Sequence, residues 1–527
     1  MEEKVKTGQK DIVSNILKVV LGLFFIGVWA LILFGEGVAP VRFMIPNFCL
    51  FIAGSILLVL VVSGRQHLHI NKLKIFLEKR EKLCLGVISG ILLVVQLFII
   101  YETIFQTAWD VQAVWYGSLW AALGDKQGIS DMSEYFSIYP NNLLLVFIFS
   151  RVLKLKEVMH IPIENGGMLL AFVQAVIVNI TGIIVYRCAR YFGSVLTAWG
   201  VYIGYILQIG VSGWIVIPYS DGMGILFPVL MLYLYLKLKD TDTIWKKDIL
   251  VFLLLGTGMI AYHTKPYTVI VLIAIVILEV WKSFSYIGKG EESAKRWKRG
   301  AVYVLCAICA CCISMAGIQT ASNSMGFDID HERALEVSHH LLIGINKETW
   351  GGFNENILAF SQGIPDKNER TRAEMNAVYD RLKEMNVTEY LNFTWHKAAK
   401  NYLNGTFGWG MDEEFYTEIY PSRGKICDVL RAWYYGYEEA AQYHMLILQF
   451  VWIITLILVP FSVIMRRKLS DQEQVTILSV IGLMLYLQIF EAHARYVFVF
   501  VPFFLILAAC GAANIRGFMG RKKEKNE

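Results

Sequence analysis

The sequence predicts an all-α polytopic membrane protein with about 12–13 membrane helices and one large extracytoplasmic insertion. Of its 527 residues, 56% are hydrophobic and 18% are charged, whereas soluble domains carry about a quarter charged residues. The mean hydropathy is +0.49. Apolar stretches of about 18 residues or more, long enough for a membrane helix, recur along the whole chain.

Thirteen stretches are candidates for membrane helices. The opening MEEKVKTGQKDI is too polar, and the apolar run after it too long, for a cleaved signal peptide, so the first helix is expected to remain. The stretches lie near 12–34, 43–63, 83–101, 143–155, 167–186, 191–212, 219–236, 249–263, 267–282, 300–320, 445–465, 474–491 and 494–515.

Lysine and arginine in short loops predict the orientation, because such loops stay in the cytoplasm. The basic segments are 64–81, 237–247, 289–299, 466–468 and the tail that begins at Arg516. The opposite, extracytoplasmic face is then expected to hold 102–142, 217–221, His263–Pro266, 321–444 and 491–495. The net charge of +5 is small, and we expect no nucleic-acid partner.

The segment 143–155 is expected not to cross the membrane. Thirteen full crossings would place some of these loops on the wrong side, and this segment has only about 13 residues where about 20 are needed. A re-entrant or interfacial segment puts Arg187 and Arg190 inside and Asp221 outside. It also leaves Arg151 and its neighbouring lysines outside, against the charge rule.

These patterns divide the chain into four parts. Residues 1–82 form a two-helix extension with a basic cytoplasmic loop, and 83–320 form a membrane core whose first outer loop is 102–142. Residues 321–444 are an extracytoplasmic helical insertion, in which apolar residues at helical spacing predict one or two amphipathic helices. Residues 445–527 add the last membrane helices and a basic cytoplasmic tail.

Polar residues gather at the expected extracytoplasmic face, where charges beside apolar spans usually face a cavity or a partner. Each of them taken alone is equally well explained as an interfacial residue in contact with water. The set comprises Asp110, Glu134, Asp221, His263, Lys265, His339, His340, Glu491, His493 and Arg495.

Three of these residues have sequence contexts that favour a functional site over a position that is merely interfacial. Asp221 follows Pro218 and precedes Gly222, so the backbone can bend there and approach another group closely. Asp110 lies among aromatic residues in WDVQAVW, just past a membrane helix. Arg495 begins the last helix, where a guanidinium suits a phosphate held at the membrane surface.

Several short motifs resemble the GT-C glycosyltransferase superfamily, and the nearest branch is that of bacterial enzymes related to protein O-mannosyltransferase and lipid A aminoarabinose transferase. They are an early Asp in the first outer loop, a Tyr-Pro-Asn helix start at 139, and YSD at 219–221. A Lys-Pro turn at 265, HHLLIGINKETWGGFNEN at 339–356 and EAHARYVFVFVPFFLILAA at 491–509 complete the set. The resemblance runs from about residue 83 to the end.

The resemblance implies a transferase that moves a sugar from a polyprenyl-phosphate donor to an extracytoplasmic acceptor. It implies Asp110 as the catalytic base. Such a reaction also needs positive charge on the departing phosphate, and Arg495, His493 and Lys265 are the candidates to bind the donor phosphate. Many relatives have a pair of acids in this loop, but Val111 follows Asp110 here. Glu134 is therefore the candidate for the second acid. Asp221, and with it His340, would order the acceptor or hold a divalent metal ion, the one candidate cofactor.

A single displacement would invert the anomeric centre. The expected location is the cell membrane, in contact with membrane lipids and with a cell-envelope acceptor that the sequence does not identify. A lipid-linked polysaccharide ligase or polymerase is the main alternative and should depend less on Asp110. A transporter ranks third, because it would place charges near the bilayer midplane and usually contain repeats.

Overall fold

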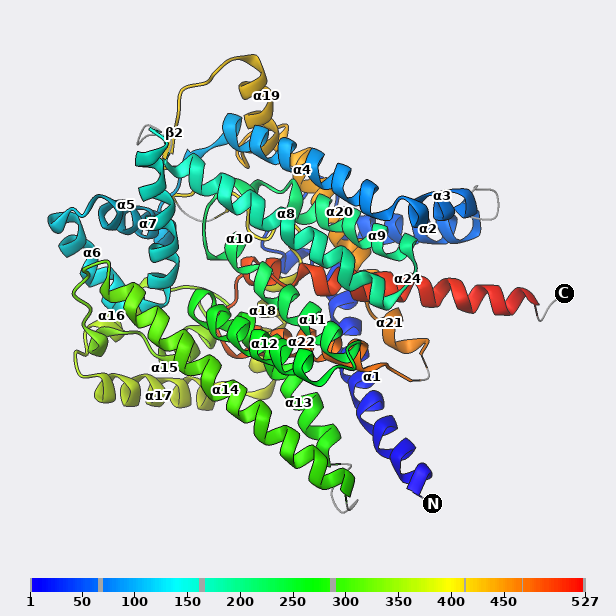
Figure 1. The fold of residues 1–527 in the computed structure, drawn as a ribbon. Helices are drawn as coiled ribbons and strands as arrows, with labels where there is room; N and C mark the ends of the chain where they lie inside the picture. Colours follow the sequence, from blue (N-terminus) through cyan, green and yellow to red (C-terminus); the bar gives the residue numbers. More distant parts are fainter. Residues whose placement is uncertain are drawn as a thin grey trace.

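The computed structural model describes residues 2–64, 70–160, 166–284, 291–411, 414–466 and 468–524, so parts of the basic loops and of the tail lie outside the described residues. Figure 1 shows a bundle of long helices with shorter helices gathered at one end. The helices are α1 (Glu2–Phe34), α2 (Asn47–Gly64), α3 (Ile70–Lys79), α4 (Glu81–Thr103), α5 (Trp109–Leu123), α6 (Lys126–Ile138), α7 (Leu143–Val158), α8 (Gly166–Phe192), α9 (Val195–Tyr205), α10 (Ser220–Gly224), α11 (Leu226–Lys239), α12 (Ile244–Thr264), α13 (Ile270–Phe284), α14 (Glu291–Asn323), α15 (Val337–Gly344), α16 (Glu355–Gln362), α17 (Lys367–Glu384), α18 (Val387–Tyr402), α19 (Lys425–Tyr434), α20 (Ala441–Leu458), α21 (Phe461–Ile464), α22 (Asp471–Ile489), α23 (Arg495–Phe498) and α24 (Val501–Glu524).

The predicted fold class is confirmed: this is an all-α polytopic membrane protein. Among the described residues, nine helices are long and apolar enough to cross a membrane, and the bent pair α6–α7 is a tenth candidate. The stretches near 43–63, 191–212 and 249–263 account for the larger number expected from the sequence. They form α2 and α9, which are short, and α12, whose first turns carry Lys246, Lys247 and Asp248. All three pack alongside the longer helices.

We call the end of the bundle that carries the start of α14 and the C-terminal ends of α11 and α24 the basic side, and the opposite end the outer side. The segment expected not to cross, α7, lies at the outer side. The Arg151 guanidinium donates a hydrogen bond of 2.8 Å to the hydroxyl of Ser324, directly after the outer end of α14. The segments 126–138 and 140–156 meet at 115°, the geometry of a broken span or a re-entrant segment.

The first two helices belong to the membrane body rather than to an extension. Leu21, Phe25 and Ile32 of α1 are fully buried, and the indole N–H of Trp29 donates to the carbonyl oxygen of Leu456 at 3.1 Å. α1 packs against α20, α21 and α22, and α2 packs against α20. The expected division at residue 82 therefore does not correspond to a structural boundary.

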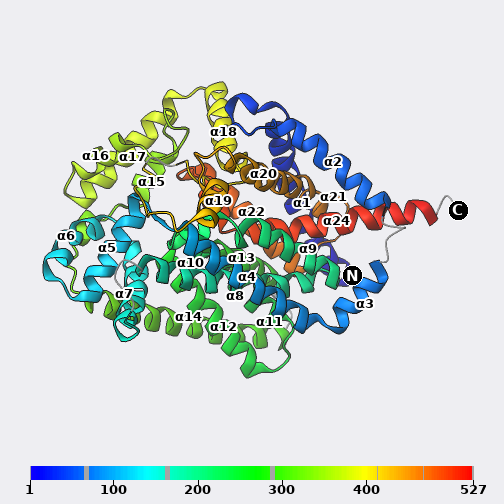
Figure 2. The same ribbon diagram turned by 90° about the horizontal axis from the view of Figure 1, so that it is seen from above.

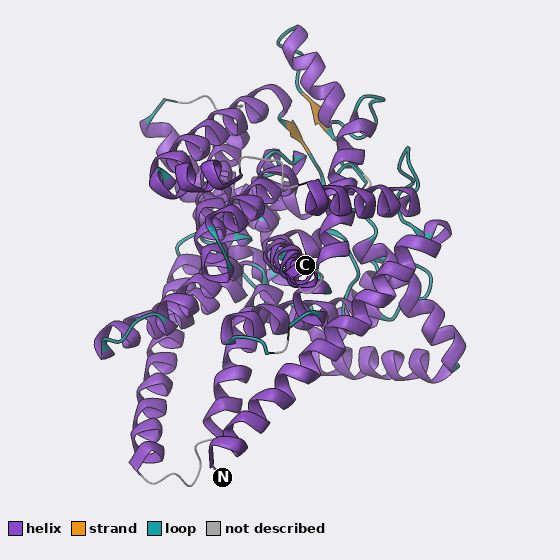
Figure 3. Cartoon of the chain, turned by 90° about the vertical axis from the view of Figure 1, so that its right-hand side faces the viewer, coloured by secondary structure: helices purple, strands orange, loops and turns teal. Residues whose placement is uncertain are grey.

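The insertion at 321–444 contains two parts. Helices α15 to α18 form the first, in which α15, α16 and α17 share a small apolar core that includes Leu342, Ile357 and Val378, while Ala399 and Tyr402 of α18 belong to the main core. Figure 2 shows α15, α16 and α17 grouped at one edge of the molecule. The second part returns to the first outer loop, where β2 (Glu418–Ile419) pairs antiparallel with β1 (Phe105–Gln106); Figure 3 shows both strands in orange. α19 then packs on α4.

Candidate functional site

Asp110 lies in the first turn of α5, and two tyrosines hold its carboxylate. The Tyr135 hydroxyl donates to Oδ1 at 2.6 Å and the Tyr219 hydroxyl to Oδ2 at 3.1 Å. Asn142 donates to the Tyr135 hydroxyl at 3.0 Å. Trp109 has a φ of 52°, a left-handed conformation that is costly for a bulky residue and that concentrates at functional sites. Asp110 itself is half-buried, so its carboxylate is oriented and still accessible.

Asp221 pairs with two cations close to Asp110. Its side chain is 3% exposed, and it forms an ion pair with the ammonium group of Lys265, which is 7% exposed. Arg495 Nε lies 3.6 Å from Asp221 Oδ2, which is the distance of an ion pair and too long for a hydrogen bond. One buried carboxylate therefore holds two cations side by side.

The backbone before Asp221 is held in place by Gln174. The side-chain amide of Gln174 donates to the carbonyl oxygen of Ile217 at 2.8 Å and accepts from the N–H of Tyr219 at 3.0 Å. A Cβ on Gly222 would lie 2.2 Å from Gln174 Cδ. Glycine at 222 is therefore required by the close approach of α8 to the start of α10, which fixes the position of Asp221.

Tyr219 joins the two carboxylates. Its hydroxyl contacts Asp110, and its ring centre lies 5.8 Å from Lys265 Nζ and 5.9 Å from Arg495 Cζ. Arg495 Cζ also lies 5.0 Å from the Trp109 ring, a cation–π geometry that stabilises a guanidinium away from water. We call Asp110, Tyr219, Asp221, Lys265 and Arg495 the Asp110 site. Its two carboxylates balance its two cations.

A third carboxylate, Glu491, lies near the site and was missing from the predicted site residues. The Tyr496 hydroxyl donates to Glu491 Oε2 at 2.9 Å. Burial and, after it, the negative charges of Asp110 and Glu491 raise the pKa of Tyr139. Tyr139 therefore lies within electrostatic range of both carboxylates, which places Glu491 near the Asp110 region.

Hydrogen bonds connect the turn that carries Glu491 to the insertion. The buried Lys397 ammonium donates to the carbonyl oxygens of Gly344 and Gln488, the latter at 2.9 Å. The N–H of Ala492 donates to the carbonyl oxygen of Gly351 at 2.7 Å. Burial lowers the pKa of Lys397 to about 7. The contacts of α18 with the end of α22 thus fix the turn that precedes Arg495.

His493 and Arg495, two of the predicted phosphate ligands, lie next to this turn and differ in their contacts. His493 accepts the backbone N–H of Arg495 through Nδ1 at 3.1 Å, so it shapes the turn into α23. Arg495 points its guanidinium into the Asp110 site. Lys265, the third predicted ligand, is held by Asp221 instead of facing outward.

The predicted metal ligands do not come together. Asp221 faces two cations, which would repel a metal ion, and the electrostatic neighbours of His340 are Glu491 and Glu374. Burial lowers the pKa of His340. In the described part of the chain, no group of three or more His, Cys, Asp or Glu side chains could hold a metal ion. The residues present at Asp221 therefore do not fit a metal site.

Glu134 does not serve as a second acid beside Asp110. Its carboxylate is 68% exposed and pairs with Arg333 at 2.8 Å. Glu134 and Tyr135 are consecutive on α6, so their side chains point about 100° apart around the helix, and Tyr135 is the one that faces Asp110. Tyr135, and not Glu134, is therefore the residue of α6 that contacts Asp110.

Comparison with known proteins gives a family. No curated protein and no solved structure matches the chain. One family model matches residues 24–514, which cover α2 to α23, the last third of α1 and the first half of α24. The chain therefore belongs to the family described as conserved hypothetical integral membrane protein.

Proposed function

We propose that the protein is a membrane glycosyltransferase that moves a sugar from a polyprenyl-phosphate donor to a hydroxyl group of an extracytoplasmic acceptor. A cell-wall polymer, a glycolipid or a protein would be such an acceptor. The observation that carries the proposal is the connection, through Tyr219, between the half-buried carboxylate of Asp110 and the cations Lys265 and Arg495. The reaction needs a base for the acceptor and positive charge for the departing phosphate.

The chemistry follows from these positions. Asp110 accepts the proton of the acceptor hydroxyl while the acceptor oxygen forms a bond to the anomeric carbon. The bond between that carbon and the phosphate oxygen breaks, and its electron pair leaves with the polyprenyl phosphate. Arg495 and Lys265 stabilise the charge that develops on this phosphate. One displacement inverts the anomeric centre, and no step requires a metal ion.

The surroundings of the site support a lipid-linked donor. The membrane-span candidate Ser220–Lys239 begins next to Asp221, and the candidate Val501–Met519 follows Arg495 closely. Groups at the ends of membrane helices lie at the level of the lipid headgroups. A polyprenyl chain can therefore remain in the bilayer while its phosphate reaches Arg495.

The direct test uses the purified protein in lipid vesicles with a panel of polyprenyl-phosphate sugars and simple hydroxyl acceptors. We expect transfer of a single sugar from one of these donors, with inversion at the anomeric carbon. Transfer of a preassembled polymer would support a lipid-linked polysaccharide ligase instead. Absence of transfer from every donor, with solute movement across the vesicle membrane, would support a transporter.

Replacing Arg495 with lysine is expected to raise the donor concentration needed for half-maximal rate by about tenfold. Lysine keeps the charge and loses the planar fork that binds a phosphate with two parallel hydrogen bonds. The measurement is a donor titration with the wild-type and Arg495→Lys proteins. Arg423→Lys is the matched control, because Arg423 is exposed and contacts Tyr101 outside the site. Unchanged donor kinetics in Arg495→Lys would reject the phosphate-binding role.

The insertion is expected to face the extracytoplasmic side. Asn376 on α17 and Thr243 before α12 are both exposed and lie at the outer and basic sides. In intact cells, a membrane-impermeant maleimide should label Asn376→Cys and should label Thr243→Cys only after the membrane is opened. The wild-type protein, with its nine cysteines, measures the background. The reverse pattern would invert the orientation and place the Asp110 site inside the cell.

A further inference from the structure

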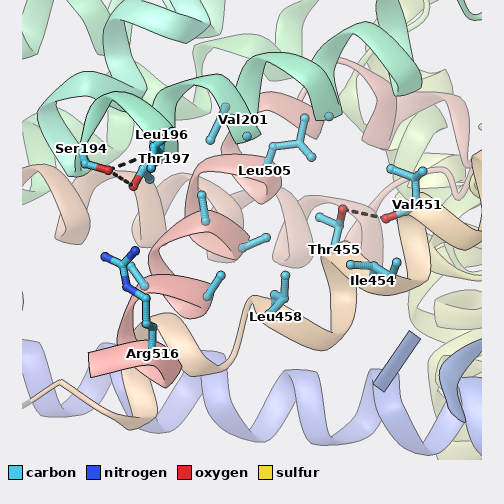
Figure 4. A pocket seen from close by; sticks show the side chains of 16 residues that line it. Ser194, Leu196, Thr197, Val201, Val451, Ile454, Thr455, Leu458, Leu505 and Arg516 are labelled. Atoms are coloured by element: carbon cyan, nitrogen blue, oxygen red, sulfur yellow. Dashed lines mark hydrogen bonds between the residues drawn. The ribbon is translucent and has the colours of Figure 1, made fainter. Parts of the chain in front are cut away.

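A cavity of about 310 Å³ lies between α9, α20 and α24, apart from the Asp110 site. Figure 4 shows its lining side chains, which are mostly short and apolar. Ala508 and Ala512 of α24 and Leu458 of α20 line two walls, and Gly200 and Gly204 line the third. The cavity belongs to the part of the bundle where α24 packs against both α9 and α20.

Glycines create the space and leave it open on one side. A Cβ on Gly204 would lie 2.8 Å from Leu505 Cδ2, so α9 and α24 approach closely at this level. Gly200 is exposed, and a Cβ there would meet nothing within 4 Å. In a chain that spans a membrane, an apolar cavity with an exposed wall faces lipid chains.

One end of the cavity is polar, and it is the end at the basic side. Figure 4 shows Arg516 there, across from Ser194 and Thr197. The hydroxyl oxygens of Ser194 and Thr197 are 3.2 Å apart, and Arg516 is exposed. Arg516 is the one charged residue in the lining, and no carboxylate within the described ranges pairs with it. This end therefore offers positive charge beside hydroxyl groups.

The length of the cavity matches one leaflet of a bilayer. Leu505 and Arg516 both line it and belong to the same helix, so their separation along the helix axis is about 16 Å. Half of a hydrocarbon core of about 30 Å is about 15 Å. The apolar walls thus extend from the headgroup level at the basic side to about the middle of the membrane.

We propose that this cavity binds one acyl chain of an anionic glycerophospholipid from the basic-side leaflet, with the lipid phosphate at Arg516. Lipid chains are as apolar as the cavity walls, so burial of the chain selects weakly among lipids. The charge of the headgroup provides the selection, because a basic residue near the membrane surface attracts anionic lipids. The proposal is independent of the glycosyltransferase proposal, since it uses none of the residues of the Asp110 site.

The test measures lipid binding to the purified full-length protein by native mass spectrometry. The probes are phosphatidylglycerol and phosphatidylcholine with the same acyl chains, and polyprenyl phosphate as a competitor. We expect phosphatidylglycerol to bind more tightly than phosphatidylcholine. Arg516→Ala should weaken phosphatidylglycerol binding by about fivefold, as expected for the loss of one cation near a lipid phosphate.

A variant that fills the cavity, a control variant outside it and competition by polyprenyl phosphate test whether the lipid binds in this cavity. Gly200→Leu should abolish the tightest phosphatidylglycerol binding, because Gly200 lines the cavity, a Cβ there meets no atom within 4 Å, and a larger side chain at this position reduces the space for an acyl chain. Arg187→Ala, at an exposed arginine of α8, should leave binding unchanged. Equal affinity for both phospholipids, or wild-type affinity in both Arg516→Ala and Gly200→Leu, would overturn the proposal. Displacement of phosphatidylglycerol by equimolar polyprenyl phosphate would overturn it too, by assigning the cavity to a polyprenyl lipid.

Discussion

Replacing Asp110 with asparagine is expected to lower the rate of sugar transfer by about 100-fold or more, the effect of removing a general base. Asparagine has nearly the same shape: its amide oxygen can accept from one of the two tyrosines that hold the carboxylate, and its amide nitrogen can donate to the hydroxyl oxygen of the other. The variant should therefore fold, enter the membrane and bind the donor. The measurement is the initial rate of transfer at saturating donor and acceptor, beside the melting temperature of the purified protein.

The matched control is Asp131→Asn. Asp131 lies on α6 in the same outer loop, is exposed, and contacts Gln127 rather than a residue of the site. This variant should keep the wild-type rate. Near-normal transfer by a well-folded Asp110→Asn protein would remove Asp110 from the mechanism, and a test of Glu491→Gln would then follow, because the charge of Glu491, like that of Asp110, raises the pKa of Tyr139.

Replacing Asp221 with asparagine is expected to lower the free energy of unfolding by about 3–5 kcal/mol, the usual effect of breaking a buried ion pair. The change leaves the cations of Lys265 and Arg495 together in a buried site without the carboxylate that holds both. Thermal and denaturant unfolding of the purified protein in detergent micelles would measure the loss. A variant that still folds should also use the donor poorly, because its two cations repel each other.

A second substitution separates the charge effect from a packing effect. Lys265→Met in the Asp221→Asn background removes one of the two cations, and this double variant should recover part of the lost stability. Asp240→Asn, at an exposed position next to the basic end of α11, should change stability by less than about 0.5 kcal/mol. If the double variant is less stable than Asp221→Asn alone, the repulsion between the cations is not the cause.

The sequence predicted most of the membrane bundle because apolar runs of sufficient length are a local signal. It predicted a membrane span at α12, but Lys246, Lys247 and Asp248 shorten the apolar run there, and α12 is not among the helices long and apolar enough to cross a membrane. It did not predict that α1 packs against α20 and α22. Contacts between helices more than 400 residues apart leave no periodic pattern in a single sequence.

Four of the predicted site residues are charged, and charged residues beside membrane helices have few structural uses. Asp110, Asp221, Lys265 and Arg495 do come together, although 385 positions separate the first from the last. Tyr135 and Tyr219 were missed because aromatic residues are common throughout this chain, with 26 tyrosines among them. Only the position of Tyr219 directly before Ser220 and Asp221 could have indicated its role. The pairing of Asp221 with two cations depends on three separate elements, so the sequence suggested a metal site there instead.

The contact between α1 and α20 has a consequence for biosynthesis. The indole N–H of Trp29 donates to the carbonyl oxygen of Leu456, 427 residues later in the chain. At a synthesis rate of about 5–20 residues per second, the partner emerges roughly 20–90 s after Trp29 does. During that interval α1 can pack against α2, which follows it directly, but its contacts with α20, α21 and α22 cannot form until the ribosome has made nearly the whole chain.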